Sequence, residues 1–411
     1  MEYGCIGEKL RHSFSKEIHS ALADYSYDLV ELAKDEVDKF FENRQFKAIN
    51  VTIPYKETAL PHLDYISDEA KQIGAVNTVV NKDGKLYGYN TDFFGMLRLA
   101  ERMQIEVQGK TVAVLGSGGT SKTATAVSAF LGAKQILKVS RTPKESFITY
   151  EALYAMAEQI DVIINTTPVG MYPEIYKSPV DVNEFVNLSG VIDAVYNPLC
   201  SKLVTDAENK GIKASGGLYM LVAQAALAVE KFIDVTVSNE KIDAVYNSLL
   251  KAKENIVLIG MPSAGKTTVG KLLAKELGKE FFDSDVVLEK NQRKTIPEIF
   301  KEKGEAYFRE LEKNTVFMLA QKNSAVIATG GGVILNGENI EMLKENGKII
   351  FLDRPLNLLF GTNDRPLSKN KADVEKLYNE RYDKYKACAD FIIDASGSLE
   401  ETVNKILKVS V

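Results

Sequence analysis

Short apolar runs alternate with amphipathic stretches from the start of the chain. In the first 102 residues, the runs Lys47–Ile53 and Thr78–Val80 predict strands. Ser15–Asp24 has apolar residues spaced by about 3.6 positions, the period typical of a helix. This segment therefore predicts a mixture of short strands and helices.

The next hundred residues show a more regular alternation. Apolar runs at Thr111–Leu115, Gln135–Ser140, Asp161–Asn165 and Val191–Ala194 predict four strands. A glycine-rich turn follows the first of them and leads into a helical pattern that ends near Leu131. Strands that alternate with helices in this way favour a parallel, doubly wound α/β sheet.

A helical region then connects to a second α/β pattern. GGLYMLVAQAALAVEKF predicts a helix over Gly217–Phe232, and residues 234–254 are expected to continue as helix with charged breaks. We expect a short, semi-rigid connection at residues 249–254, because this stretch has no tract of glycine, proline or serine. Further apolar strands are predicted at the start of the sequence LIGMPSAGKTTVGKLLA and at Ala325–Ala328.

Length and composition limit the class of protein. A chain of 411 residues predicts two to three domains at about 150 residues each. The net charge of −5 and pI of 5.6 favour neither nucleic acid nor an anionic membrane as a partner. The three cysteines have no ligand spacing, and neither a secretory signal nor an 18-residue apolar run is apparent, so we expect a cytoplasmic protein. The sequence leaves open whether it is a monomer or a homodimer.

The segment Gly260–Thr267 fits the pattern G-x-x-x-x-G-K-[ST] in full. Such a loop lets backbone N–H groups converge on phosphate oxygens at a helix N-terminus. We expect Lys266 to reach the β- and γ-phosphates and the Thr267 hydroxyl to bind Mg²⁺. The predicted ATP-binding residues are Gly260, Ser263, Ala264, Gly265, Lys266, Thr267 and Thr268.

Several polar positions follow this phosphate loop. Asp283 and Asp285 lie two residues apart at a predicted strand end, and Thr329–Gly332 forms a second glycine corner after a strand. Carboxyl ends of strands are where α/β sheets bind ligands. Three arginines with distinctive neighbours complete the set: Arg309 in YFRELE, Arg365 in NDRPLS and Arg381 in ERYDKY.

Taken together and in this order, these motifs resemble shikimate kinase over residues 255–411. The resemblance implies ATP-dependent phosphorylation of shikimate. It implies Asp285 as the residue that orients or deprotonates the acceptor hydroxyl, Asp283 as an Mg²⁺ partner and Arg365 as a lid residue over the phosphates. The implied acceptor site also includes Arg309, Gly331, Gly332 and Arg381. One departure is Leu358, where relatives often have a basic residue.

A second nucleotide site is predicted in the N-terminal half. Leu115–Thr120 is a glycine-rich turn between a strand and a helix, typical of dinucleotide binding. The next strand ends in Ser140-Arg141-Thr142 with no carboxylate, which favours NADP over NAD. The loop that begins at Asn165 is expected along the nicotinamide half.

The residues before this turn offer an acid–base pair. Lys56 in NVTIPYK and Asp92 in GYNTD could exchange a proton at neutral pH if they meet in a cleft. These motifs, with Ser13-Phe-Ser15, GAVNT, DAVYNP and MLVAQAA, resemble shikimate dehydrogenase over residues 1 to about 248. The resemblance implies NADPH-dependent reduction of 3-dehydroshikimate, with Lys56 and Asp92 as the catalytic pair.

Residue by residue, the resemblance implies two binding sets. The substrate would be held by Ser13, Ser15, Thr52, Asn77, Tyr196 and Gln224. The NADP(H) set is Gly116, Ser117, Gly118, Gly119, Thr120, Ser140, Arg141, Thr142, Asn165, Thr166 and Gly217. Two hydroxyls at positions i and i+2, Ser13 and Ser15, would face one side of an extended segment. Ser140 departs from the usual asparagine, and Glu145 replaces a second basic residue next to Lys144.

The expected organisation is a bifunctional enzyme of the shikimate pathway. Residues 1–248 form the dehydrogenase, with a substrate lobe (1–102 and 218–248) and a Rossmann-like NADP lobe (103–217), and 255–411 form a P-loop kinase domain similar to nucleoside monophosphate kinases. Two alternatives stay open: an NAD-using quinate/shikimate dehydrogenase in the first half, or a ligand-binding regulator. The retained Lys56, Asp92, Lys266, Thr267 and Asp285 argue against the regulator.

Overall fold

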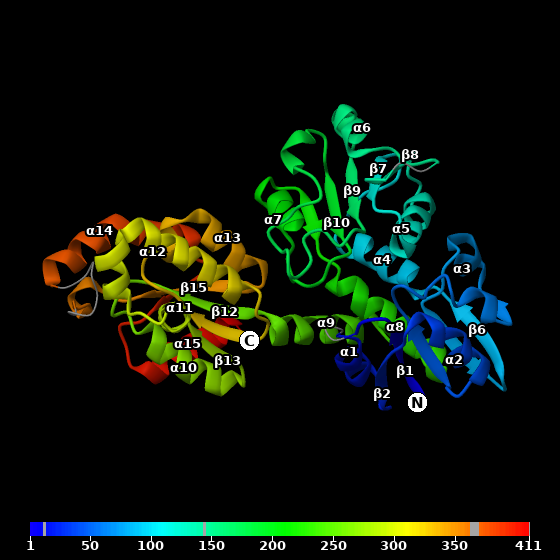
Figure 1. The fold of residues 1–411 in the computed structure, drawn as a ribbon, viewed down its shortest axis with the longest axis horizontal. Helices are drawn as coiled ribbons and strands as arrows, with labels where there is room; N and C mark the ends of the chain where they lie inside the picture. The colour runs from blue at the N-terminus through cyan, green and yellow to red at the C-terminus, as the bar shows by residue number, and fades with distance from the viewer. Residues whose placement is uncertain (11–13, 143–144, 362–369, 411) are drawn as a thin grey trace. The chain divides into compact units, whose positions relative to one another are not determined.

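The computed structural model describes residues 1–10, 14–142, 145–361 and 370–410, and the remaining positions lie outside the description. The chain divides into two compact units, Met1–Leu249 and Leu250–Val411 (Figure 1). The described residues form three β-sheets, two in the first unit and one in the second. None of the described helices combines the length and the apolar character needed to span a membrane.

The first sheet is mixed, with the strand order β2-β1-β3-β5-β6-β4. Its strands are β1 (Tyr3–Gly7), β2 (Tyr27–Glu31), β3 (Ala48–Val51), β4 (Tyr65–Ile66), β5 (Thr78–Lys82) and β6 (Lys85–Tyr89). β1 pairs in parallel with β2 and β3, whereas β3–β5 and β5–β6 are antiparallel. Helices α1 (Ser15–Leu22), α2 (Val37–Asn43) and α3 (Asp68–Ile73) belong to the same region. The strands predicted near 47–53 and 78–80 are present as β3 and β5.

The second sheet is parallel throughout, with the order β11-β10-β9-β7-β8. Its strands are β7 (Thr111–Leu115), β8 (Gln135–Val139), β9 (Val162–Asn165), β10 (Gly190–Asp193) and β11 (Lys213–Ser215). The helices along this stretch are α4 (Thr91–Arg102), α5 (Gly119–Phe130), α6 (Tyr150–Ala155) and α7 (Lys202–Asn209). The order reverses at β7, so the predicted doubly wound sheet is confirmed.

Two helices follow, α8 (Leu218–Ile233) in the first unit and α9 (Asn239–Lys253), whose residues 250–253 belong to the second. α8 packs against α4, α1, β3 and β5, so the chain returns from the parallel sheet to the first one. The expectation that helix continues from 234 is wrong for residues 234–238, because Asp234 adopts a left-handed conformation (φ 55°) that ends α8. The expected connection at 249–254 lies in the last turn of α9 and at Glu254.

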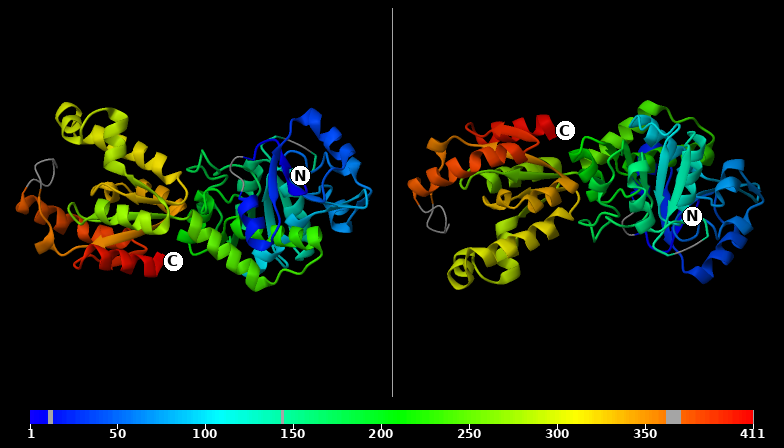
Figure 2. Two further views of the ribbon diagram at one scale, coloured as in Figure 1. Left: turned by 90° about the horizontal axis from the view of Figure 1, so that it is seen from below. Right: turned by 90° about the horizontal axis from the view of Figure 1, so that it is seen from above.

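The second unit contains a parallel sheet with the order β13-β14-β12-β15-β16. Its strands are β12 (Asn255–Ile259), β13 (Glu280–Asp283), β14 (Ala325–Ala328), β15 (Gly347–Asp353) and β16 (Phe391–Asp394). The helices are α10 (Lys266–Leu277), α11 (Ser284–Gln292), α12 (Ile296–Ala320), α13 (Gly337–Glu345), α14 (Lys371–Cys388) and α15 (Leu399–Ser410). Figure 2 shows α15 (red) and α12 (yellow) on opposite sides of the strand layer. Helices cover both faces, as parallel sheets require.

An unusual residue in the core of the first unit is His19 on α1, which is fully buried. Its ring stacks on Tyr27 with centroids 3.9 Å apart, and its Nδ1 lies 2.6 Å from the hydroxyl of Tyr25. Burial lowers the pKa of His19 to about 3. The imidazole is therefore neutral in the folded protein at neutral pH.

This buried imidazole predicts a pH-dependent stability of the first unit. The unfolded chain takes up a proton at His19 below pH 6.5 and the folded chain does so only near pH 3. The contribution of His19 is thus fully present above pH 6.5 and falls by about 1.4 kcal/mol per pH unit between pH 6.5 and 3. His19→Phe keeps a stacked ring and should remove this slope.

The measurement is urea unfolding followed by far-UV circular dichroism, since the chain has no tryptophan. Between pH 6.5 and 4.5, the wild type should lose about 2–3 kcal/mol relative to His19→Phe. A constant difference between the two proteins over this range would contradict the account.

Candidate active sites

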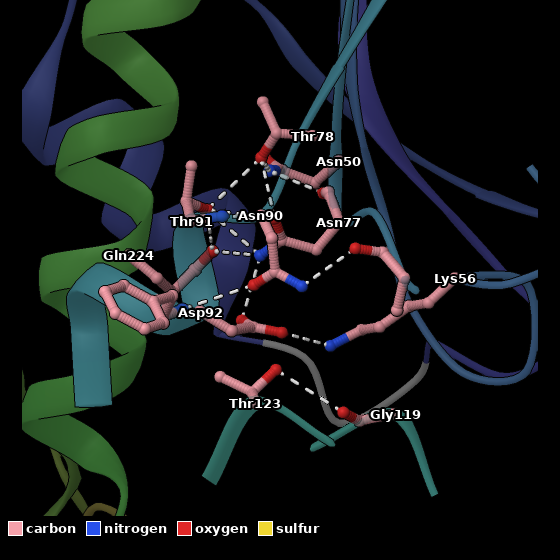
Figure 3. Close-up of polar contacts among 12 residues, drawn as sticks. Asn50, Lys56, Asn77, Thr78, Asn90, Thr91, Asp92, Gly119, Thr123 and Gln224 are labelled. Carbon is pink, nitrogen blue, oxygen red and sulfur yellow. Dashed lines mark hydrogen bonds and ion pairs between the residues drawn. The ribbon is translucent and has the colours of Figure 1, made fainter. Parts of the chain in front are cut away.

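In the first unit, Lys56 and Asp92 form an ion pair between the turn after β3 and the start of α4. Lys56 lies in the turn after β3, and Asp92 is in the first turn of α4. The Lys56 Nζ lies 2.5 Å from Asp92 Oδ2, and the side chains are only 14% and 10% exposed (Figure 3). A close, largely desolvated ion pair of this kind can hold a proton donor in a fixed position.

Asp92 is fixed on its other oxygen by Asn77, which precedes β5. The Asn77 Nδ2 donates to Asp92 Oδ1 at 2.9 Å, and its Oδ1 accepts from the backbone N–H of Thr91 at 2.7 Å. Gln224 on α8 joins the cluster, since its Oε1 accepts from Asn77 Nδ2 (3.3 Å) and Thr91 Oγ1 (3.2 Å) (Figure 3). The structure therefore brings together Lys56, Asn77, Asp92 and Gln224.

Sequence reasoning missed the polar residues behind this cluster. Asn50 Nδ2 donates to Thr78 Oγ1 at 3.1 Å and to the carbonyl of Asn77 at 3.2 Å, and the Tyr27 hydroxyl donates to Asn50 Oδ1 at 2.7 Å. Asn90 caps α4 by accepting from Phe93 N. Asn50 and Asn90 are part of the motifs quoted above, but only the structure shows that they are buried and hold Asn77 and the start of α4.

The remaining substrate candidates have different positions. Ser13 lies outside the described residues, and Thr52 follows β3 and is partly buried. The expected extended segment at Ser13–Ser15 is wrong at its C-terminal end, because Ser15 begins α1 and Phe14 already has helical angles (φ −84°, ψ 0°). Buried Phe14 packs on Tyr196 with centroids 5.4 Å apart, and this contact fixes the start of the helix.

The glycine turn after β7 fits a dinucleotide. Gly116 has φ 116°, and a Cβ there would lie 2.6 Å from Thr166 Oγ1. Gly118 has open space beside it, and α5 begins at Gly119 with Ser117 and Thr120 next to it. A Cβ on Gly119 would lie 3.7 Å from the Lys56 side chain, so this turn adjoins the acid–base pair.

The other predicted cofactor residues lie at the carboxyl ends of neighbouring strands. Ser140 is buried after β8, Thr142 N donates to its Oγ at 3.2 Å, and Arg141 is exposed. Asn165 ends β9, and its Nδ2 donates to Asp193 at 2.9 Å. Gly217 donates to the carbonyl of Val195, and a Cβ on it would clash with the Ala194 carbonyl oxygen. Glycine at 217 therefore permits a close approach of two backbones.

In the second unit, the phosphate loop has the geometry of an anion cradle. Gly260, Ser263 and Gly265 have positive φ angles of 148°, 67° and 93°, and α10 begins at Lys266. Lys266 Nζ donates to the carbonyls of Gly260 (2.8 Å) and Met261 (3.0 Å). The Thr267 hydroxyl donates to Asp283 Oδ2 at 2.6 Å. This hydroxyl–carboxylate pair beside the loop is the type of oxygen donor set that Mg²⁺ accepts.

The acceptor-side candidates gather around the glycine corner after β14. A Cβ on Gly330 would lie 2.6 Å from Asp285 Oδ1, and one on Gly332 would clash with the Arg309 guanidinium. Arg381 on α14 donates from Nη1 to the carbonyl of Gly331 at 2.9 Å. The structure therefore brings Asp285, Arg309 and Arg381 to the same corner, where a side chain at 330 or 332 would have to displace Asp285 or Arg309.

Glu312 is the residue of this corner that sequence reasoning missed. It is 4% exposed, and its Oε2 accepts from Arg309 Nη1 at 2.9 Å. Burial raises its pKa, whereas the charges of Arg309 and Arg381 oppose the shift. The sequence contained one indication of this pair: residues three apart on a helix, such as Arg309 and Glu312, share a face of α12.

The next two residues, Arg365 and Leu358, belong to the predicted kinase lid. Arg365 lies outside the described residues. Leu358, which replaces a basic residue of relatives, ends a short 3₁₀ helix (Leu356–Leu358) and is 38% exposed. Ala264 and Thr268 belong to the phosphate loop and the first turn of α10.

Comparisons with known proteins identify both units. Residues 5–79 match the shikimate dehydrogenase substrate-binding domain, and residues 262–410 match shikimate kinase. The chain is 38% identical over 262 residues to the NADP⁺ shikimate dehydrogenase of Clostridium beijerinckii, covering 60% of this chain and 96% of the relative. The chain belongs to the shikimate dehydrogenase family and also contains a shikimate kinase domain.

Solved structures agree with this assignment of the first unit. The shikimate dehydrogenase part resembles a chorismate mutase/shikimate 5-dehydrogenase fusion from Clostridium acetobutylicum (36% identity, TM-score 0.57, covering 60% of this chain and 96% of that one). It also resembles the shikimate 5-dehydrogenase of Thermus thermophilus (28% identity, TM-score 0.55, 60% and 99% covered). With its kinase domain, this protein is a bifunctional enzyme of the shikimate pathway.

The glycine corner generates a prediction for the kinase. Gly332→Ala needs no backbone rearrangement, because φ is −103°, but its methyl group must displace the Arg309 guanidinium. We expect the kinase kcat/KM for shikimate to fall about 10- to 100-fold, with little change in the midpoint of unfolding.

Gly337→Ala is the matched control, since a Cβ at this exposed helix start meets nothing within 4 Å. Steady-state kinase assays with shikimate compare the two variants. Equal activity of Gly332→Ala, Gly337→Ala and wild type would show that the position of Arg309 is unimportant.

Proposed function

We propose that the first unit reduces 3-dehydroshikimate to shikimate with NADPH and that the second unit phosphorylates the 3-hydroxyl of shikimate with ATP. The observation that supports this most directly is the Lys56–Asp92 pair, 2.5 Å apart, beside the Gly119 turn of the dinucleotide fold. This proximity supports a proton donor close to the bound dinucleotide. The product of the first reaction is then the acceptor of the second.

In the proposed reduction, the ammonium of Lys56 protonates the oxygen that becomes the new hydroxyl. Asp92 holds the ammonium in place, while the Asn77 amide restrains the carboxylate by donating to its other oxygen. Bound NADPH supplies the hydride in the first unit, and bound ATP supplies the phosphoryl group in the second. In the reverse direction, neutral lysine accepts the proton from the shikimate hydroxyl.

Substrate recognition is assigned to hydroxyl and amide side chains. Asn77 and Gln224 lie in the cluster around Asp92, and Thr52 is four residues from Lys56. Ser15 at the start of α1 and Tyr196, which packs on Phe14, are assigned to the substrate carboxylate side with Ser13. Neutral donors of this kind can bind a carboxylate and several hydroxyls without a large desolvation cost.

In the proposed phosphorylation, Asp285 orients the acceptor hydroxyl and takes its proton. Arg309 and Arg381 clamp the substrate carboxylate with Gly331 and Gly332 at the same corner. Lys266 leaves the Gly260 and Met261 carbonyls to neutralise phosphate charge, and Thr267 with Asp283 would hold Mg²⁺. Arg365 is assigned to the phosphates from the lid by resemblance alone. NADPH and ATP as substrates agree with the expected cytoplasmic location.

NADP is the proposed cofactor rather than NAD. Arg141 is exposed directly after β8, where it can reach a 2′-phosphate, and Ser140 shapes the turn that presents it. The Clostridium beijerinckii relative is named as an NADP⁺ enzyme, and the Thermus thermophilus structure contains NADP(H) and shikimate. A shikimate 5-dehydrogenase structure from Listeria monocytogenes contains NAD, so the choice needs a direct test.

Two substitutions should separate the activities. Lys56→Ala removes the proton donor and is expected to lower dehydrogenase kcat by about 10²- to 10⁴-fold, while kinase activity stays at the wild-type level. Asp285→Asn should lower the kinase activity and leave the dehydrogenase activity at the wild-type level. Each variant is assayed for NADP⁺ reduction with shikimate and for ADP release with shikimate, so each activity controls for the folding of the other sample. Full retention of both activities in either variant would refute the assignment.

Arg141→Ala tests the cofactor assignment. Losing a charge-assisted contact with the 2′-phosphate is expected to raise KM for NADPH about 10- to 100-fold and to leave KM for NADH unchanged. Glu145→Gln is the comparison variant, because it removes an exposed negative charge four residues away and should lower KM for NADPH slightly. Equal changes for both cofactors in Arg141→Ala would favour the NAD-using alternative.

A further inference from the structure

Asp193 is a fully buried carboxylate at the end of β10 with no role in the proposed chemistry. It accepts three hydrogen bonds. Asn165 Nδ2 (2.9 Å) and Val195 N (3.0 Å) donate to its Oδ1, and the Ser201 hydroxyl donates to its Oδ2 at 2.6 Å. One side chain thus joins the end of β9, the loop after β10 and the start of α7.

Two of the three donors, Asn165 and Val195, belong to segments that carry proposed binding residues of the dehydrogenase. Asn165 also fixes the loop that follows it. Its Oδ1 accepts from Thr167 N (3.0 Å) and Thr167 Oγ1 (2.7 Å), and we call residues 165–167 the cofactor-side loop. Val195 precedes Tyr196, and its carbonyl accepts from Gly217 N at 2.8 Å. The Asp193 carboxylate therefore fixes the cofactor-side loop relative to the segment that contains Val195 and Tyr196, the substrate-side loop.

The raised pKa of Asp193 indicates that the buried carboxylate does not serve mainly to stabilise the fold. Burial raises the pKa of Asp193 to about 6, although its three hydrogen bonds oppose the shift. A buried charge costs free energy that well-packed apolar side chains would not. A fully bonded polar group does, however, specify one arrangement of its partners.

We propose that Asp193 is a positioning residue of the dehydrogenase, which aligns the Asn165–Thr167 loop with Val195 and Tyr196 through its three accepted hydrogen bonds. The inference rests on the proposed function for the ligand side of these loops. It predicts an effect on binding of NADPH and shikimate more than on proton transfer, because the Lys56–Asp92 pair is held by other elements.

The test compares Asp193→Ala with Asp193→Asn in the full chain. Alanine removes the carboxylate that three buried donors share, so we expect KM for NADPH and for shikimate to rise about 10- to 100-fold, with a smaller change in kcat. Asparagine keeps the oxygen that Asn165 and Val195 use, and its amide can donate to Ser201 Oγ, because a hydroxyl also accepts. Asp193→Asn should therefore stay within about threefold of wild type.

Asp161→Ala is the matched control at the other end of the same sheet. Its carboxylate accepts from Thr111 N at 2.8 Å and from Lys110 at 3.3 Å, at the start of the strands. We expect this variant to lower the midpoint of thermal unfolding without changing either KM. Kinase activity measured in every sample reports on folded protein.

Two outcomes would overturn the proposal. In the first, Asp193→Ala and Asp161→Ala lower only the unfolding midpoint and leave both KM values unchanged, which makes Asp193 purely structural. In the second, Asp193→Asn is as impaired as Asp193→Ala, so that charge rather than hydrogen bonding matters. Absence of dehydrogenase activity in the wild type would instead contradict the proposed function.

Discussion

Both units of this chain depend on the rule that parallel strands bring their carboxyl ends to one edge of a sheet. In the first unit, β7, β8, β9 and β10 end at Leu115, Val139, Asn165 and Asp193. Every proposed NADP contact except Gly217 lies at or just after the end of β7, β8 or β9. In the second, β12, β13 and β14 end before the phosphate loop, at Asp283, and before the glycine corner. Side chains distant in sequence meet because the strands carry them to the same edge.

The shared strand edges bring the segments of each site together, and each unit also contains a close approach at a glycine. Gly217 lies against the Ala194 carbonyl in the first unit, and Gly332 lies against the Arg309 guanidinium in the second. Hydrogen-bonded carboxylates then restrict the charged groups, Asp92 at Lys56 and Glu312 at Arg309. The same logic extends to Asp193, whose three bonds join loops rather than bind a ligand.

Much of this arrangement is predictable from the sequence, and the reasons for the failures are local. The pattern predicts the strands Thr111–Leu115 and Ala325–Ala328 with the bounds that the structure has, because both are short, buried, mostly apolar runs. The helical angles of Phe14 are not predictable in this way, since its packing on Tyr196 joins residues far apart in sequence. The burial of Asn50, Asp193 and Glu312 escapes sequence analysis for a related reason: their type suggests surface residues, and only the tertiary structure shows their partners.

We propose that one chain reduces 3-dehydroshikimate and then phosphorylates the shikimate that it forms. The most direct measurement incubates the purified protein with 3-dehydroshikimate, ATP, Mg²⁺ and NADPH that has deuterium at C4, using each C4 epimer in turn, and analyses the products by mass spectrometry. We expect shikimate 3-phosphate with one deuterium from one epimer, and ADP release only when NADPH is present. ADP release without NADPH, or shikimate that accumulates without being phosphorylated, would contradict it.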